Sequence, residues 1–136
     1  MPQDPKVILL ADDDLDDQEL LEEAILELEP SAEVHTVMSG RQVVEYLQQC
    51  NGTDLPCLII LDYNMPEASG AEVLQLLCND SRYTNIPKVI WSTSNAPSHI
   101  QDCLDKGAAW YFVKPAKLSQ LTSLAEKMLA LCQAAA

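Results

Sequence analysis

The chain has 136 residues, 48% of them hydrophobic and 21% charged, a balance typical of a globular domain rather than a disordered protein. Its formal net charge of −13 opposes binding to nucleic acid and to anionic membrane surfaces, so neither is expected as a partner. We expect one domain over residues 1–136, with its core from about 6 to about 132.

The cysteines and the N-terminal residues indicate the cellular compartment of the protein. There are five cysteines, an odd number, and no two form a Cys-x-x-Cys pair, so we expect unpaired thiols in a reducing environment. The first residues, Met-Pro-Gln-Asp-Pro-Lys, lack the basic and apolar parts of a signal peptide, and no apolar run reaches the length of a membrane span. These features predict a cytoplasmic protein.

The first half of the chain alternates apolar runs with helical patterns. Val7 to Ala11 predicts a buried strand, and Leu15 to Leu28 follows it with apolar residues at helical spacing. Ala32 to Val37 alternates more with polar residues, which predicts a strand nearer an edge of the sheet. Ser39 to Cys50 predicts the next helix, with Ser39 as its N-cap.

The second half continues this alternation. Three further runs are apolar on both faces, as is typical of central strands in a parallel sheet: Cys57 to Leu61, Val89 to Trp91 and Trp110 to Val113. Helical patterns cover about 71–77, 97–106 and the segment from Lys117 to the C-terminus. Both tryptophans are expected in the core.

The last helix is expected to pack one face on the sheet. Its apolar stripe consists of Leu118, Leu121, Ala125 and Met128. Leu124 and Leu129 fall on other faces of the helix. We therefore expect these two leucines to be exposed and available for a contact, for example in a homodimer.

Five strands that alternate with five helices predict an α/β fold, a doubly wound five-stranded parallel sheet with helices on both faces. Ligands of such sheets bind beyond the carboxyl ends of the strands. The polar residues at those ends are Asp12 and Asp13, Asp62, Ser92 and Lys114. Each alone is well explained as an ordinary polar strand end, but three carboxylates, a hydroxyl and an ammonium from four segments favour a common site.

These residues and their neighbours resemble the receiver domains of response regulators. The matching segments are Leu9-Leu10-Ala11-Asp12-Asp13, Leu61-Asp62-Tyr63-Asn64-Met65-Pro66 with Gly70, Trp91-Ser92-Thr93, and Tyr111-Phe112-Val113-Lys114-Pro115. The intervals between them also fit the family. The resemblance implies a flavodoxin-like receiver fold and a stand-alone response regulator of a two-component phosphorelay.

The resemblance also implies a phosphoacceptor and a metal site. Asp62 would accept a phosphoryl group from a sensor histidine kinase or a phosphotransfer protein. Asp13 and Asp62 would be direct ligands of Mg²⁺, the carbonyl of Asn64 would be a third, and Asp12 would act through water. No turnover of an external substrate is implied, although the domain can hydrolyse its own acyl phosphate.

Three other residues would respond to the phosphoryl group. Lys114 would supply a cation to its oxygens and Ser92 a hydroxyl donor. Tyr111 occupies the switch-aromatic position, three residues before the lysine, but is equally well explained as a core residue. The signal would leave through the surface of the fourth helix, the fifth strand and the fifth helix, toward a downstream protein effector.

The run of three aspartates at 12–14 leaves the register of the acidic pair open between Asp12 with Asp13 and Asp13 with Asp14. We favour the first pair because the last apolar residue of the strand directly precedes it. Asp14 then begins the loop, and with Asp16 and Asp17 it favours the start of the following helix through the helix dipole.

Other interpretations are weaker. A phosphatase of the haloacid dehalogenase type would use Asp12 as its nucleophile, but it needs a further acidic pair after Lys114, where only Glu126 follows. A flavodoxin would hold phosphate with backbone amides where this loop has carboxylates. A pseudo-receiver that no longer takes phosphate is disfavoured because every chemical position is filled. Within the family, the acid-rich first loop is most similar to receivers that partner bacteriophytochromes.

Overall fold

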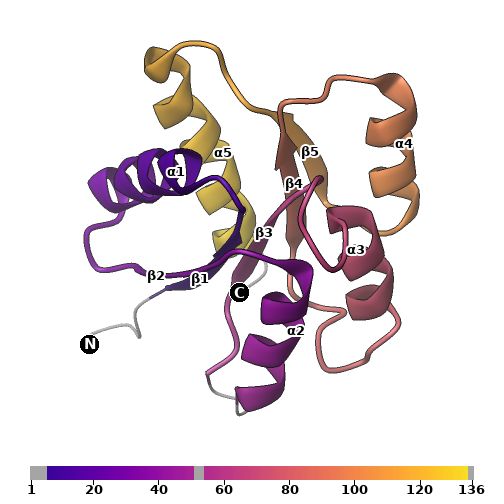
Figure 1. Ribbon diagram of the computed structural model, residues 1–136. Coiled ribbons are helices and arrows are strands. Elements are labelled where there is room, and N and C mark those ends of the chain that lie inside the picture. Colours follow the sequence, from indigo (N-terminus) through magenta and orange to yellow (C-terminus); the bar gives the residue numbers. More distant parts are fainter. Residues whose placement is uncertain (1–5, 51–53, 135–136) are drawn as a thin grey trace.

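The computed structural model describes residues 6–50 and 54–134, in which five strands alternate with five α-helices (Figure 1). The strands are β1 (Val7–Ala11), β2 (Glu33–Val37), β3 (Leu58–Asp62), β4 (Lys88–Ser92) and β5 (Trp110–Val113). The helices are α1 (Leu15–Leu28), α2 (Gly40–Gln49), α3 (Gly70–Cys78), α4 (Pro97–Asp105) and α5 (Leu121–Ala134), with a short 3-10 turn, η1 (Leu118–Gln120), before α5.

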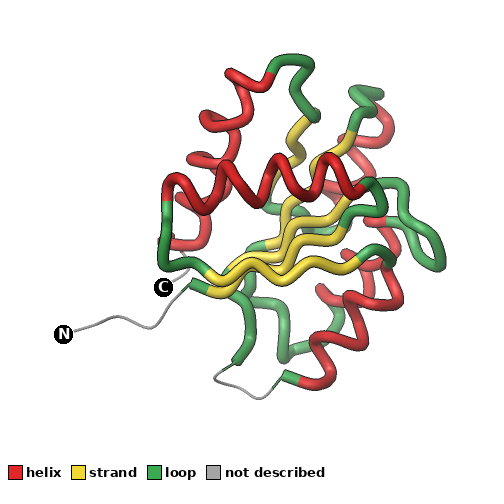
Figure 2. The backbone as a smooth tube through the Cα atoms, turned by 60° about the vertical axis from the view of Figure 1, so that its left-hand side comes forward, coloured by secondary structure: helices red, strands yellow, loops and turns green. Residues whose placement is uncertain are grey.

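The strands form one parallel sheet in the order β2-β1-β3-β4-β5. Helices α1 and α5 cover one face, and α2, α3 and α4 cover the other (Figures 1 and 2). This confirms the predicted doubly wound α/β fold. It also confirms that the second strand, with its more alternating sequence, lies at an edge.

Each central strand contributes side chains to two separate cores, because successive residues of a strand point to opposite faces. Ile8, Leu10, Leu58, Ile60, Val89 and Trp91 are buried under α1 and α5. Leu9, Ala11, Ile59, Leu61, Ile90 and Tyr111 are buried under the other three helices. Two buried faces explain why the apolar runs are continuous, and each fully buried leucine or isoleucine stabilises the fold by about 1.5–3 kcal/mol.

Polar side chains fix where the helices begin and end. Asp14 caps α1 by accepting hydrogen bonds from two backbone N–H groups of the first turn. Ser39 caps α2 as predicted, and Ser69 forms a capping box with Glu72 at the start of α3. Gly107 follows α4 with a φ of 108°, a left-handed conformation that a side chain would disfavour. The predicted helix boundaries are therefore correct to within a few residues.

Three hydrophobic residues depart from the sequence expectations. The prediction that Trp110 to Val113 forms a central strand is wrong, because β5 lies at an edge of the sheet with a neighbour on one side only. Trp110, expected in the core, is consequently 56% exposed. Leu118, expected on the packed stripe, is 67% exposed because it lies in the 3-10 turn, where side chains follow a spacing of three residues. Leu129, expected to be exposed, is buried because α5 packs against α1 as well as the sheet.

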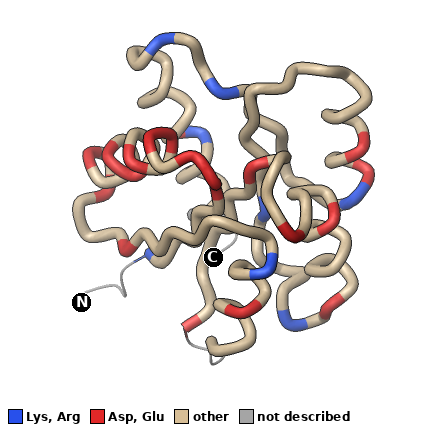
Figure 3. Tube along the Cα trace, in the orientation of Figure 1, with Lys and Arg blue, Asp and Glu red and all other residues tan. Residues whose placement is uncertain are grey.

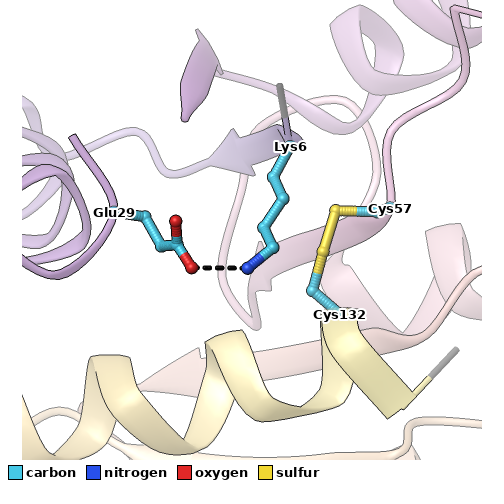
Figure 4. Close-up of a disulfide and its surroundings, with 4 residues drawn as sticks. All are labelled: Lys6, Glu29, Cys57 and Cys132. Carbon is cyan, nitrogen blue, oxygen red and sulfur yellow. Dashed lines mark hydrogen bonds and ion pairs between the residues drawn. A yellow bond between two sulfur atoms is a disulfide. The ribbon is translucent and has the colours of Figure 1, made fainter. Parts of the chain in front are cut away.

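The cysteine expectation is also wrong. Cys57, just before β3, and Cys132, near the end of α5, form a disulfide with their Cα atoms 5.4 Å apart (Figure 4). The ion pair between Lys6 and Glu29 lies beside it. Cys50, Cys78 and Cys103 are free thiols. A sequence separation of 75 residues gives no local signal for this pairing, which only the folded chain brings together.

Candidate functional site

The predicted site residues lie at one edge of the sheet because the strands that carry them are parallel. Asp62 and Ser92 are the last residues of β3 and β4. Asp12 and Lys114 directly follow β1 and β5. In the strand register Asp62 lies opposite Trp91, one residue before Ser92. The fold therefore brings four distant segments of the chain to the same place.

Three carboxylates gather at this edge. The side chains of Asp12, Asp13 and Asp62 each have an oxygen within 4.8 Å of the others. Asp12 and Asp62 are buried, whereas Asp13 is exposed. Among the described residues this is the acidic group with spacing suited to a metal ion. Further acidic residues run along the neighbouring helix α1 (Figure 3), so the surroundings favour a cation over an anion.

The loops that follow β1 and β3 orient the two buried carboxylates. Asp12 accepts a hydrogen bond of 2.9 Å at Oδ1 from the backbone N–H of Asp14. Asp62 accepts one of 3.3 Å at Oδ1 from the N–H of Asn64. Gly70 approaches the backbone oxygen of Asp62 so closely that any side chain at residue 70 would collide with it. Each carboxylate thus has one oxygen fixed by its own loop and the other directed into the site.

Lys114 occupies the centre of the site. Its Nζ donates hydrogen bonds to Oδ2 of Asp12 and of Asp17, both at 2.8 Å, and to Oδ2 of Asp62 at 3.2 Å. Nζ also lies 4.8 Å from the ring centre of Trp91. Burial alone would lower the pKa of Lys114, but the hydrogen bonds to Asp12 and Asp17 and the charge of Asp62 outweigh it and raise the pKa above its ordinary value. The lysine is therefore a permanent cation.

Burial has the opposite consequence for the acid that Lys114 contacts. It raises the pKa of Asp12 from 3.8 to about 6, although the hydrogen bonds from Lys114 and Asp14 act against this rise. An acid whose folded-state pKa is raised opposes folding once it ionises, so this penalty is complete above about pH 6 and declines as the pH falls from there toward 3.8. A cation bound beside Asp12 would offset it.

The donor set fits Mg²⁺. Hard carboxylate oxygens are the ligands that this ion prefers, and it commonly takes one or two of them together with waters. The residues positioned to hold it are Asp12, Asp13 and Asp62. Asp14 lies outside this group and uses its Oδ1 to cap α1, which supports the Asp12 and Asp13 register. The role of the Asn64 carbonyl stays a prediction.

Ser92 and Tyr111 meet at the loop between β4 and α4. Ser92 is fully buried, and its Oγ accepts a hydrogen bond of 3.2 Å from the N–H of Ser94. Tyr111 is buried as well, and its hydroxyl donates to the carbonyl of Ser94 at 2.8 Å. The Oγ of Ser94 in turn lies 2.7 Å from Nδ1 of His99 in α4. One loop residue therefore connects Ser92, Tyr111 and the fourth helix.

Asp17 is the site residue that the sequence analysis missed. We expected it only to favour the start of α1 through the helix dipole, but it forms an ion pair with Lys114. The available signal was its place in the first turn of a helix that begins four residues after β1. Such a turn lies directly above the strand ends, so the side chain of the third residue of the helix can reach into the site.

Binding of Mg²⁺ should weaken below about pH 6, because protonated Asp12 no longer attracts a cation. The apparent affinity should fall by up to about tenfold for each pH unit below that pKa. Calorimetric titration with Mg²⁺ at several pH values measures this change. Asp12→Asn should bind Mg²⁺ more weakly and with a flatter pH dependence, and equal wild-type affinities at about pH 7 and about pH 5 would contradict the role of Asp12.

Comparison with known proteins agrees with this geometry. Residues 8–126 match the family described as the response regulator receiver domain. The two-component response regulator ARR9 of Arabidopsis thaliana is 34% identical over 139 residues, which cover 90% of this chain and 58% of that protein. The regulator ORR3 of Oryza sativa subsp. japonica is 28% identical, with 95% of both chains covered. This chain spans about 60% of the length of several of these plant relatives, including ARR8 at 60%.

Solved structures match over nearly the full length. The phosphorylated cyanobacterial phytochrome response regulator RcpA has a TM-score of 0.87 at 32% identity, with 97% of this chain and 96% of that chain covered. The Mn²⁺-bound form of response regulator Rcp1 has a TM-score of 0.80 at 28% identity, with 93% of each chain covered. The resemblance found in the sequence is thus confirmed, and the chain belongs to the response regulator receiver domain family.

Proposed function

We propose that this chain is a single receiver domain that accepts a phosphoryl group on Asp62 from a histidine kinase or a phosphotransfer protein. The observation that carries the proposal is the position of Asp62, which shares the acidic cluster with Asp12 and Asp13 and accepts a hydrogen bond from Lys114. The family match and the phosphorylated state of RcpA support it. No helix in the described ranges is long and apolar enough to cross a membrane. We propose a cytoplasmic location, in which the Cys57–Cys132 pair would meet reducing conditions.

Transfer of the phosphoryl group requires only one covalent step at the protein, at Asp62. A carboxylate oxygen of Asp62 attacks the phosphorus of phosphohistidine, the P–N bond breaks, and the departing ring nitrogen takes a proton from water, so that a neutral imidazole leaves. Phosphoryl transfer depends mainly on position and on neutralised charge. Lys114 is placed to donate to a phosphoryl oxygen. Bound Mg²⁺, held by Asp13 and Asp62 with Asp12 acting through water, would supply the further positive charge that the phosphoryl oxygens require.

The same arrangement provides a route for the signal. A phosphoryl oxygen would accept a hydrogen bond from the Ser92 hydroxyl and draw Oγ toward it, which would stretch or break the bond that Oγ accepts from the N–H of Ser94. Because the hydroxyl of Tyr111 is bound to the carbonyl of Ser94, a moved loop would release or redirect this side chain. The surface formed by α4, β5 and α5 would then change shape. Exposed hydrophobic residues lie on β5 and on η1, just before α5: Trp110, Val113 and Leu118. This surface can therefore bind a downstream protein or a second copy of the chain.

The rival functions fit the geometry less well. A phosphatase with Asp12 as its nucleophile would need a further acidic pair after Lys114, where only Glu126 follows. Asp12 is also completely buried, whereas Asp62 keeps a small exposed area. A pseudo-receiver would not need the acidic cluster and the lysine together. We therefore propose a protein that takes up a phosphoryl group and turns over no external substrate.

Incubation with acetyl phosphate tests the proposal. With Mg²⁺, intact-protein mass spectrometry should find one phosphoryl group per chain, and chelation of the metal should abolish the uptake because the acidic cluster then repels the donor. No uptake with Mg²⁺ present would favour a pseudo-receiver. Continuous hydrolysis of a phosphate ester such as p-nitrophenyl phosphate would favour a phosphatase.

A further inference from the structure

The strongest unassigned feature of the site is the ion pair between Asp17 and Lys114. The ammonium of a lysine has three N–H donors, and here each is directed to a different carboxylate. Two of these carboxylates, Asp12 and Asp62, belong to the acidic cluster suited to a metal ion. Asp17 does not belong to that cluster. It is therefore the acceptor of Lys114 that neither metal binding nor phosphorylation would engage.

Asp17 stands on a turn that is fixed to the sheet. Its backbone N–H donates to Oδ1 of Asp14 at 3.2 Å, as part of the N-cap of α1. The next residue, Gln18, is buried, and its side-chain amide nitrogen donates to the backbone carbonyls of Asp12 and Val37 at 2.7 and 2.8 Å. These bonds join the first turn of α1 to the ends of β1 and β2. The carboxylate of Asp17 thus projects from a rigid support.

The side chain of Lys114 has space beside it. A cavity of about 170 Å³ borders Asp17, Trp91 and Lys114. Packing alone therefore does not fix the position of Nζ, and its hydrogen bonds decide where the charge lies. When Asp62 carries a phosphoryl group, Lys114 must release at least one carboxylate to donate to it. The bond to Asp62 is the longest of the three, at 3.2 Å, and is the one we expect to be exchanged.

We infer that Asp17 is a positioning residue that holds Lys114 while the lysine moves one donor from Asp62 to the phosphoryl group. This inference rests on the proposed function. Without Asp17, the remaining acceptors of the ammonium are the carboxylates of Asp12 and Asp62, so Lys114 stays on the nucleophile and competes with Mg²⁺. The variant should consequently accept phosphate more slowly, even at saturating Mg²⁺.

A pair of neighbouring variants separates this role from a general charge effect. Asp16 lies in the same helical turn and has the same charge, and its backbone N–H donates to the same N-cap oxygen, Oδ1 of Asp14. Its side chain is exposed, with no cation among its described partners. Asp17→Asn should lower the initial rate of phosphorylation by acetyl phosphate about tenfold, because the lysine is misplaced. Asp16→Asn should change it less than about twofold. Asp17→Glu, which keeps the carboxylate, should recover part of the rate.

Beryllofluoride mimics the phosphoryl group, and the fluorine NMR shifts of its complex would not respond to a change in helix stability alone. The fluorine that Lys114 contacts should shift in Asp17→Asn and not in Asp16→Asn. Equal rates and equal fluorine spectra in the two asparagine variants would overturn the inference. If Asp17→Asn fails to fold, Asp17→Ser with Asp16→Ser repeats the comparison. Absence of phosphorylation in the wild-type chain would instead refute the proposed function, and the role of Asp17 with it.

Discussion

Asp62→Asn should fold like the wild-type chain and take up no phosphoryl group from acetyl phosphate. The amide has nearly the shape of the carboxylate, and its oxygen can still accept the N–H of Asn64, so the loop after β3 is retained. What is lost is the charged oxygen that attacks phosphorus, and one of the three ligands of the acidic cluster with it. Both losses lower the uptake of the phosphoryl group.

Mass spectrometry of the intact protein measures uptake, and circular dichroism with thermal unfolding checks the fold. Asp16→Asn is the matched control, since it removes an exposed carboxylate from the first turn of α1 and leaves the acidic cluster of three aspartates unchanged. It should be phosphorylated normally. A normal yield from Asp62→Asn would move the chemistry to another residue, with Asp12 the first to test.

Cys57→Ser should lower the free energy of unfolding by about 4 kcal/mol relative to the oxidised wild-type chain. The disulfide closes a loop across a separation of 75 residues, and a cross-link of that span restricts the unfolded chain strongly. For a domain of this size the loss corresponds to a fall in Tm of roughly 15 °C. Reduction of the wild-type protein should lower its Tm to that of the variant, whose own Tm should not respond to reductant.

Cys78→Ser provides the control, because Cys78 is a free and partly exposed thiol. It should keep the dependence of Tm on reductant. Phosphorylation should change little on reduction, since Cys57 lies before β3 and Asp62 at its end. Alkylation of five thiols in the unreduced, denatured protein, or a Tm that reductant does not alter, would show that Cys57 and Cys132 do not pair.

Much of the fold could be predicted because its physical causes are local. Residues 58–61 and 89–91 read as apolar without interruption since both faces of the sheet are covered. Caps such as Ser39 act within one helical turn. The convergence of Asp12, Asp62 and Lys114 also followed from a simple rule, because parallel strands end at the same edge.

What could not be predicted depends on contacts between distant segments. The pairing of Cys57 with Cys132 is set by where α5 ends relative to β3, which no spacing in the sequence records. The exposure of Trp110 follows from the strand order, since only the assembled sheet makes β5 an edge. The ion pair of Asp17 requires the exact rotation of α1 over the strand ends. Helix periodicity places Asp17 on a face but does not say that Lys114 reaches it.

The most direct test of the central claim is to locate the phosphoryl group. The chain is phosphorylated with acetyl phosphate and Mg²⁺, the acyl phosphate is reduced with borohydride, and the peptides are sequenced by tandem mass spectrometry. Reduction converts a phosphorylated aspartate to homoserine, so the label is retained through digestion. Homoserine at position 62, absent when the metal is chelated, is the predicted result. Homoserine at position 12 or 13, or at no position, would contradict the assignment of Asp62 as phosphoacceptor.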